Sequence, residues 1–559
     1  MWQALRDRYP LLFALLGALF FIPFLGGVHL FDWDEANFAE ISREMLLLKD
    51  FTRVHVNFEP FFQKPPLFFW LQAASMQLFG VGEFAARLPN ALCGALTLAL
   101  LFRMGQRLKG KRFGILWAGV YFGSVLPFLY FKSGIIDPWF NLFIFLGLYH
   151  FILSYWKKES FEGIEPPYSA SRHLMLGGAF IGLAMLTKGQ AAYLIIVLAM
   201  GVYWVYQRFR LYVSIPRFLL FTAVAFLVTL SWFGAEVLSN GPAFVVEFFR
   251  YQYRLFSTPD AGHKGFPAYH FAVLLVGCFP ASIFAIRAFF RLPDEGKPYE
   301  KDFRRWMKYL FWTVLILFSI VQSKIVHYSS LCYFPLTYLA ALSIEKTISG
   351  QARLNGWMRF GLWSIGGMYV LATLALPVLG MQAEAFKKLV VDPFAQGNLE
   401  AEVHWTGLEM LPGLFLLSLL SIFFFLQRKG RQASSFFLLF GGVAVFTMLT
   451  LIFFVKRVEG YSQRAAVSFF ESKSNEDCYL DVYGYKSYVH LFYGRPMHAG
   501  EACFADTACQ NRLLYGPIDK PVYIAAKVHK ARDLRNIPSM EEIGGENGFV
   551  FFRRMPASE

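Results

Sequence analysis

A series of long apolar runs constrains this chain more than any other feature. The runs fall at about 11–30, 84–102, 113–131, 138–155, 173–187, 189–206, 218–238, 268–290, 306–322, 329–345, 359–380, 406–426 and 433–455. A helix of ~20 residues rises 1.5 Å per residue and so crosses a hydrocarbon core of roughly 30 Å. The pattern predicts an α-helical polytopic membrane protein with about 13 transmembrane helices, and a domain boundary near residue 455.

Composition and charge agree with this class. Hydrophobic residues make up 56% of the chain and charged residues only 16%, against about 25% in soluble proteins. The net charge of +14 does not indicate a nucleic-acid partner, because the basic residues lie in short clusters between apolar runs.

The basic clusters also predict an orientation. They occupy alternate loops, as in Arg103 to Arg112, Lys157 and Lys158, Arg208 and Arg210, Arg287 to Arg305, and Arg428 to Arg431. Cytoplasmic loops carry the excess of Lys and Arg. We therefore expect a cytoplasmic N-terminus and, with 13 spans, a C-terminus on the outer face.

The outer side is expected to carry a long first loop, 31–83, and a small α/β domain, 456–559. Three segments of the latter alternate as strands do, 478–483, 521–526 and 548–552, whereas 485–492 and 540–542 are read as helices or turns. Cys503 and Cys509 lie close together in this domain. In an oxidising compartment they could form a disulfide or remain as two free thiols, and the sequence does not decide between these. The six cysteines form no zinc-like spacing.

A cluster of acidic residues follows the first apolar run. Asp32, Asp34 and Glu35 come within four residues, at the expected membrane boundary. One interpretation is a hydrophilic stop after a span. The other is a catalytic or ligand-binding loop at the membrane surface.

Further ionisable residues gather on the same side, and at membrane depth such residues mark function by default. The set is Asp34, Glu35, Lys64, Arg87, Asp137, Lys188, His263, Lys324 and Tyr328. Cations beside carboxylates suit an anionic lipid-linked substrate, with Lys and Arg on a phosphate and a carboxylate accepting a proton.

Each of these residues also has a structural interpretation. Lys188 at the end of a span could extend its ammonium to the interface, and Asp137-Pro138 could begin a helix. His263 could be an ordinary loop histidine, and Lys324 could merely end a helix. Only their joint placement on one face favours a site.

The motifs resemble a known superfamily. The segment 34–45 is similar to the Asp-Glu signature of the C-type integral-membrane glycosyltransferases, above all the bacterial aminoarabinose transferases of lipid A and the protein O-mannosyltransferases. Further similar elements follow in the same order: Lys64-Pro65-Pro66 with Trp70, Ala86 to Pro89, Asp137-Pro138, Thr187-Lys188-Gly189, and Ser323-Lys324 with Tyr328 and Pro335.

The resemblance implies a membrane glycosyltransferase of the bacterial inner membrane. It would use a polyprenyl-phosphate sugar as donor and act with inversion at the outer, periplasmic face. It makes Asp34, Glu35 and Asp137 the catalytic residues, and Lys64, Arg87, Lys188, Lys324 and Tyr328 the ligands of the donor phosphate.

Two positions depart from the family pattern. Gln63 replaces a glutamate of the family's metal site, whose histidine His263 matches, and an amide is a much poorer ligand for a zinc-like ion. A divalent metal cofactor is therefore doubtful. Gln190 replaces the proline that follows the Lys-Gly element.

The alternatives from other classes are a transporter or flippase for a lipid-linked sugar, and a scaffold that binds polyprenyl phosphate without catalysis. The long outer loop, the outer domain and the lack of repeat symmetry argue against transport. The sequence leaves open the sugar and whether the acceptor is lipid A, another glycan or a protein.

Overall fold

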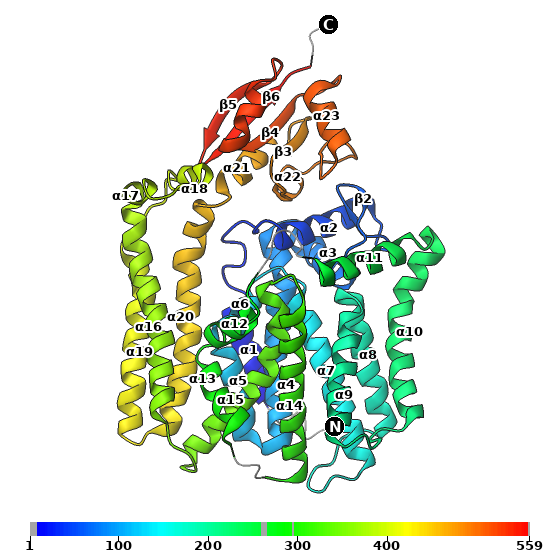
Figure 1. Cartoon of the computed structure of the whole chain (residues 1–559), viewed down its shortest axis with the longest axis vertical. Coiled ribbons are helices and arrows are strands. Elements are labelled where there is room, and N and C mark those ends of the chain that lie inside the picture. The colour runs from blue at the N-terminus through cyan, green and yellow to red at the C-terminus, as the bar shows by residue number, and fades with distance from the viewer. Residues whose placement is uncertain (1–7, 259–264, 293–295, 557–559) are drawn as a thin grey trace.

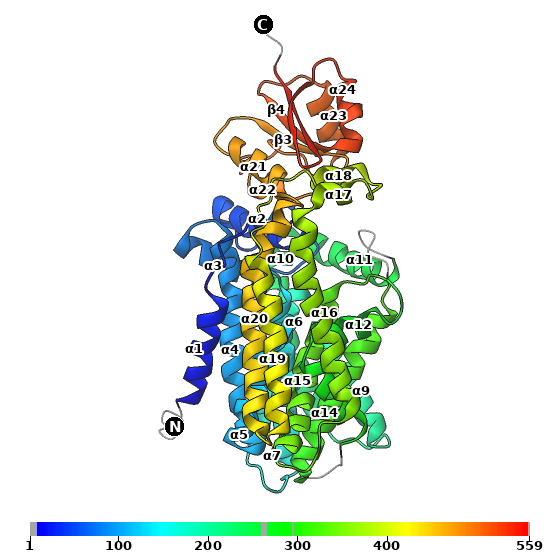
Figure 2. The ribbon, with the colours of Figure 1, turned by 90° about the vertical axis from the view of Figure 1, so that its left-hand side faces the viewer.

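The computed structural model describes residues 8–258, 265–292 and 296–556. Long helices stand side by side in a bundle, and the C-terminal residues form a smaller α/β unit at one end of it (Figures 1 and 2). The bundle contains α1 (Tyr9–Phe21), α4 (Glu83–Lys109), α5 (Lys111–Phe122), α6 (Val125–Tyr130), α7 (Asp137–Lys158), α8 (Ala170–Lys188), α9 (Ala191–Tyr206), α10 (Ile215–Asn240), α12 (Tyr269–Gly277), α13 (Ala281–Phe290), α14 (Pro298–Ile320), α15 (Tyr333–Ile348), α16 (Gly356–Met381), α19 (Leu411–Arg428) and α20 (Gln432–Gly460).

Each of the thirteen predicted runs coincides with one of these helices or with two consecutive ones. The run 113–131 is divided into α5 and α6, and the run 268–290 into α12 and α13, which meet at a bend of 118°. Within the described residues, six helices are long and apolar enough to cross a membrane, or seven if α12 and α13 form one span. The chain is thus a helical multi-pass membrane protein, and the count of 13 spans stays a prediction.

Close packing of α7 against α8 positions two of the predicted site residues. A Cβ on Gly147 would lie 2.5 Å from Ile181 Cδ1, and one on Gly177 would lie 3.0 Å from the Gly147 carbonyl oxygen. Small residues let helix backbones approach in this way. As a result, the first residue of α7, Asp137, and the last residue of α8, Lys188, meet at one end of the bundle.

Short surface elements cover the end of the bundle nearest the C-terminal unit (Figure 1). They are α2 (Asp34–Leu48), the hairpin β1 (His55–Val56) and β2 (Glu59–Pro60), α3 (Leu67–Phe79), α11 (Ala243–Ser257), η2 (Val326–Cys332), α17 (Ala383–Lys387), α18 (Pro393–Asn398) and η3 (Leu408–Met410). Two of them, α2 and α3, lie within the predicted loop 31–83.

The C-terminal unit is a four-stranded sheet with small helices. Its strands β3 (Tyr479–Tyr483), β4 (Val522–Lys527), β5 (Glu541–Glu546) and β6 (Phe549–Arg554) lie in the order β3-β4-β6-β5, and only β3 and β4 are parallel. Its helices are α21 (Arg464–Lys473), α22 (Val489–Phe492), α23 (Thr507–Tyr515), η4 (Val528–Lys530) and α24 (Ala531–Arg535).

The structure confirms the strands predicted for this unit and corrects the interpretation of one segment. The three predicted strands are present, and a disulfide joins Cys503 to Cys509. The interpretation of 540–542 as a helix or turn is wrong, because Glu541 and Glu542 pair with Arg553 and Phe552 in the edge strand β5. Its exposed side chains lack the apolar alternation that reveals a strand.

The C-terminal unit docks on the first outer loop through hydrogen bonds. Asp32 accepts one from the Tyr488 N–H at 2.8 Å, and Arg43 donates one to the Pro496 carbonyl at 2.9 Å. Asn57 donates to the Ala502 carbonyl at 3.0 Å. The unit therefore forms one wall of the space around the start of α2.

Candidate active site

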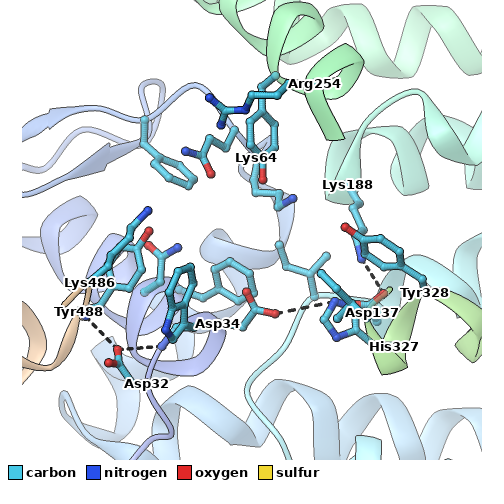
Figure 3. A pocket seen from close by; sticks show the side chains of 18 residues that line it. Asp32, Asp34, Lys64, Asp137, Lys188, Arg254, His327, Tyr328, Lys486 and Tyr488 are labelled. Carbon is cyan, nitrogen blue, oxygen red and sulfur yellow. Dashed lines mark hydrogen bonds and ion pairs between the residues drawn. The ribbon is translucent and has the colours of Figure 1, made fainter. Parts of the chain in front are cut away.

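A polar cavity of about 360 Å³ lies where α2, α7, α8, α11, η2 and the C-terminal unit converge (Figure 3). Its lining collects four cations and three carboxylates from segments far apart in the sequence: Lys64, Lys188, Arg254, Lys486, Asp32, Asp34 and Asp137. Gln63, His327, Tyr251, Tyr328 and Tyr488 also line it.

Asp137 and Lys188 form a close ion pair at the floor of the cavity. Lys188 Nζ donates to Asp137 Oδ1 at 2.7 Å, and the two side chains are 16% and 5% exposed. Each charge suits its helix end, since Asp137 begins α7 and Lys188 ends α8. Lys188 Nζ also lies 5.3 Å from the centre of the Tyr328 ring.

Asp34 is held differently from this pair. It is the first residue of α2, and its side chain is 43% exposed. His327 Nε2 lies 3.8 Å from Asp34 Oδ2 and 3.9 Å from Asp137 Oδ2, so the imidazole stands between the two carboxylates (Figure 3). No hydrogen bond engages the Asp34 carboxylate within the described residues. Its oxygens therefore face the cavity ready to accept a hydrogen bond from a bound group.

Two further cations line the opposite wall beside one aromatic ring. Lys64 Nζ lies 5.4 Å and the Arg254 guanidinium 5.2 Å from the centre of the Tyr251 ring. Lys486, from the C-terminal unit, lies 5.3 Å from the centre of the Trp33 ring. Several cations converging on one cavity are suited to a phosphate or diphosphate.

An apolar cavity of about 360 Å³ adjoins the polar one. Lys64, Asp137, Lys188 and Tyr328 line both. The remaining lining is largely apolar and comes from α7, α9, α11 and α14, with Phe140, Ala191, Leu194, Ile195, Phe249, Leu255, Leu317, Phe318 and Val321 among it. The two together have the layout of a site for an amphiphile with a charged head and a long hydrocarbon chain.

A third cavity, of about 430 Å³, reaches Asp34 from another direction. It is lined by apolar residues of α20, including Met448, Leu451 and Ile452, and by the segment after α1. Lys132 and Lys456 add positive charge to its lining. Asp32 and Asp34 line both this cavity and the polar one.

Glu35 and Arg87, predicted as a catalytic residue and a phosphate ligand, form a buried ion pair. The guanidinium donates to Glu35 Oε1 at 2.9 Å and to Oε2 at 2.7 Å, and its other N–H groups bind the carbonyls of Leu25, Val28 and His29. Glu35 also accepts from the N–H groups of Gly134 and Phe31. All five donors of the arginine are therefore engaged. The pair fixes the turn between α1 and α2. It lies outside the lining of the polar cavity, but both residues line the third cavity beside Asp34.

The electrostatics of Glu35 agree with a structural role. Burial acts to raise the pKa of Glu35, but Arg87 and the two backbone N–H groups together lower it below its ordinary value. These interactions favour the charged form of Glu35 as the partner of Arg87.

Lys324 is likewise not part of the cavity lining. Its ammonium donates to the carbonyls of Phe318, Ser319 and Val321, at the end of α14. The structural interpretation, that Lys324 ends a helix, is the one the geometry favours. His263 lies outside the described residues, and Gln63 lines the polar cavity.

Among the described residues, the side chains close enough to share a metal ion are His29, Glu83 and Glu471, outside the polar cavity. The prediction about a metal at Gln63 and His263 is therefore neither confirmed nor contradicted.

Sequence reasoning missed His327, Arg254 and Lys486 as cavity residues. His327 stands one residue before the predicted site residue Tyr328, and this position next to a candidate is the signal that the sequence offers. Arg254 belongs to the aromatic and basic stretch Tyr251 to Arg254 of the amphipathic helix α11. Lys486 was not predictable, because only the docking of the C-terminal unit brings it to the cavity.

Comparison with known proteins places these features in a family context. Residues 63–232 match the family described as dolichyl-phosphate-mannose-protein mannosyltransferase. The undecaprenyl phosphate-alpha-4-amino-4-deoxy-L-arabinose arabinosyl transferase of Edwardsiella ictaluri is 30% identical over 376 residues, which cover 65% of this chain and 65% of that protein. The Erwinia tasmaniensis protein of the same name is 28% identical over 379 residues and 66% of each chain. The alignments thus span slightly less than two thirds of these relatives.

The fold comparison covers the whole chain. The crystal structure of ArnT from Cupriavidus metallidurans bound to undecaprenyl phosphate superimposes with a TM-score of 0.77, at 18% identity and over 98% of both chains. The apo state of that protein gives a TM-score of 0.74. The fold, including the C-terminal unit, is therefore shared.

Proposed function

We propose that this chain, which resembles the C-type integral-membrane glycosyltransferases in sequence and in fold, transfers a sugar from a polyprenyl-phosphate donor to an acceptor at the outer face of the membrane. The observation that carries the proposal is the junction of the polar and apolar cavities, which share Lys64, Asp137, Lys188 and Tyr328. A charged head and a hydrocarbon chain on one molecule fit that junction.

In this proposal the donor enters laterally from the bilayer. Its polyprenyl chain lies against the apolar lining from α9, α11 and α14, and its phosphate reaches Lys64, Lys188 and Arg254. The Asp137 carboxylate positions the Lys188 ammonium through their 2.7 Å hydrogen bond. Asp137 thus acts through Lys188 and not directly on the sugar.

The reaction is a single displacement at the anomeric carbon. An acceptor oxygen forms the new bond, the bond from the sugar to the donor phosphate breaks, and the configuration inverts. The polyprenyl phosphate leaves with the electron pair, and the cations of the cavity stabilise the charge that develops on it. Where the acceptor is a hydroxyl, its proton passes to Asp34; an acceptor that is already an anion needs no base.

The acceptor approaches Asp34 through the third cavity in our proposal. Its apolar lining from α20, with Lys132 and Lys456, suits an anionic lipid such as lipid A better than a peptide. The names of the relatives make 4-amino-4-deoxy-L-arabinose the first sugar to test. Another glycan or a protein acceptor is the alternative.

The proposed orientation places the N-terminus in the cytoplasm and the C-terminal unit in the periplasm. The disulfide between Cys503 and Cys509 supports it, because such bonds persist in oxidising compartments. We further propose that transfer does not require a divalent ion, because Gln63 offers an amide where a carboxylate ligand would be needed. Full activity after exhaustive chelation is the expected result.

Mass spectrometry of lipid A, surface glycans and envelope proteins tests the function directly. The strains are the wild type, a gene deletion, and the deletion restored with the wild-type gene or with Asp34→Asn. We expect one glycoconjugate to lose a single sugar in the deletion and to regain it only with the wild-type gene. Identical profiles in all strains would instead favour a transporter or flippase.

A further inference from the structure

A basic cavity lies at the other end of the bundle, far from the proposed active site. It has a volume of about 770 Å³ and lies between the end of α15, the start of α16, the end of α19 and the start of α20. These helix ends meet at the pole of the bundle opposite the C-terminal unit (Figure 1). We propose that this cavity is a binding site for the phosphate headgroup of an anionic phospholipid of the leaflet at that end.

The charged side chains that line this cavity are all positive. Arg353, Arg359 and Arg428 line it, and no Asp or Glu is among its lining residues. Within residues 8–258, 265–292 and 296–556, none of these three guanidinium groups makes a side-chain hydrogen bond or ion pair. Three unpaired guanidinium groups around one hollow repel each other, and a bound phosphate would relieve that repulsion.

A fourth arginine adds positive charge below the cavity. Arg287 is buried at 5% exposure and donates to the Thr347 hydroxyl at 3.2 Å and to the carbonyl of Arg353. These hydrogen bonds hold the backbone of the loop that carries Arg353. The cavity therefore has a rigid floor beneath its exposed arginines.

The apolar part of the lining indicates a lipid and not a free phosphate. Trp363 and Phe424 stack with their ring centres 5.5 Å apart, and both line the cavity together with Phe425. Phe360 and Phe425, on the same helices, are 74% and 58% exposed on the outside of the bundle. Acyl chains can therefore lie along α16 and α19 while the headgroup reaches the arginines. Basic pockets between membrane helices bind anionic lipids in this way.

The inference is independent of the proposed sugar transfer, because the two sites lie at opposite ends of the bundle. Its test uses the full chain, purified in detergent, and measures retained lipid by native mass spectrometry. The probes are phosphatidylglycerol, the zwitterionic phosphatidylethanolamine and the soluble headgroup glycerol phosphate.

The decisive variant replaces Arg353, Arg359 and Arg428 by Gln. Each arginine near a membrane surface contributes about fivefold to the affinity for an anionic lipid. Loss of all three should therefore weaken phosphatidylglycerol binding roughly a hundredfold. The matched control replaces Arg103, Arg210 and Arg217, which carry the same charge but lie outside the lining, and should bind within about twofold of the wild type. Glycerol phosphate should not displace the lipid.

Three results would overturn the proposal: equal losses in both triple variants, equal binding of phosphatidylethanolamine by the wild type, or full displacement by glycerol phosphate. The last would identify a site for a soluble phosphate. If the triple variant fails to fold, the single change Arg359→Gln at an exposed position serves instead, with an expected loss of about fivefold.

Discussion

Asp34 and Glu35 are neighbours in sequence, yet they belong to regions of the molecule built on different principles. Glu35 lies in a closed network in which Arg87 and two backbone N–H groups occupy its oxygens. Asp34 faces a cavity, with His327 Nε2 3.8 Å away. Two adjacent acidic residues therefore need not share one role. The fully hydrogen-bonded carboxylate holds the fold, and the one beside it, which accepts no hydrogen bond within the described residues, is available for chemistry.

Loss of the Asp34 carboxylate should have the largest effect, and this effect should be on the rate of sugar transfer. Asp34→Asn should lower transfer by roughly 10³-fold, because the amide keeps the shape and removes the basicity. The folded yield should stay unchanged, since no hydrogen bond among the described residues depends on this carboxylate. Initial rates and size-exclusion profiles of the purified variant give both values. A variant with wild-type rates would remove Asp34 from the mechanism.

The next effect concerns stability and not rate. Arg87→Gln leaves the Glu35 carboxylate buried without its partner, which costs about 3–5 kcal/mol. The variant should melt far earlier than the wild type when heated in detergent, whereas the surviving folded fraction should keep a near-normal rate per molecule. Normal stability with a specific loss of donor binding would restore Arg87 to the phosphate site.

A third carboxylate, Asp481 in β3, shows how incomplete hydrogen bonding of a buried carboxylate affects stability as the pH changes. It is buried, and among the described residues it accepts hydrogen bonds from the Val482 N–H and from Gln510. Burial raises its pKa to about 7, against those hydrogen bonds. Because the folded value lies above the unfolded value, ionisation costs stability, and the cost is absent below about pH 4 and complete above about pH 7.

Asp481→Asn should therefore stabilise the C-terminal unit at pH 8, by at most about 4 kcal/mol from a shift of about three pKa units. At pH 4 the variant and the wild type should unfold alike. Thermal unfolding at the two pH values, followed by near-ultraviolet circular dichroism, measures the difference. A gain that does not change with pH would point to packing instead of ionisation.

The smallest expected effect separates two lysines. Lys324→Gln removes hydrogen bonds to the last carbonyls of α14 and should cost about 1 kcal/mol of stability or less, with little change in transfer. Lys188→Gln, the matched change inside the cavity, should instead raise the KM for the donor. Equal effects of the two changes on KM would return Lys324 to the donor site.

Much of this architecture could be predicted from the sequence, because helix positions follow from hydrophobic periodicity along the chain. The runs 138–155 and 173–187 coincide with α7 and α8, and the ends of these helices deliver Asp137 and Lys188. The bend between α12 and α13 was missed, although Gly277 and Pro280 interrupt this apolar run and a proline inside such a run ends or kinks a helix.

The sequence indicated which residues are candidates for the site, but not which of them pair with one another. Glu35 and Arg87 are 52 positions apart, and their pairing depends on the approach of α2 to α4, which no local pattern records. The same holds for Lys486, which enters the cavity only because the C-terminal unit docks on α2. The candidate residues were identified by their type and by the side of the membrane on which they were expected. The hydrogen bonds of the structure then separated carboxylates and cations that hold the fold from those that face a cavity.

The central claim, a donor site made of a cationic head region and an apolar groove, is tested most directly by the affinity of the purified protein for undecaprenyl phosphate and for undecaprenol. We expect the phosphate form to bind roughly a hundredfold more tightly, and Lys188→Gln to weaken binding of the phosphate form while binding of undecaprenol stays the same. Equal affinity for the two lipids, or an unchanged phosphate affinity in Lys188→Gln, would rule out this donor site.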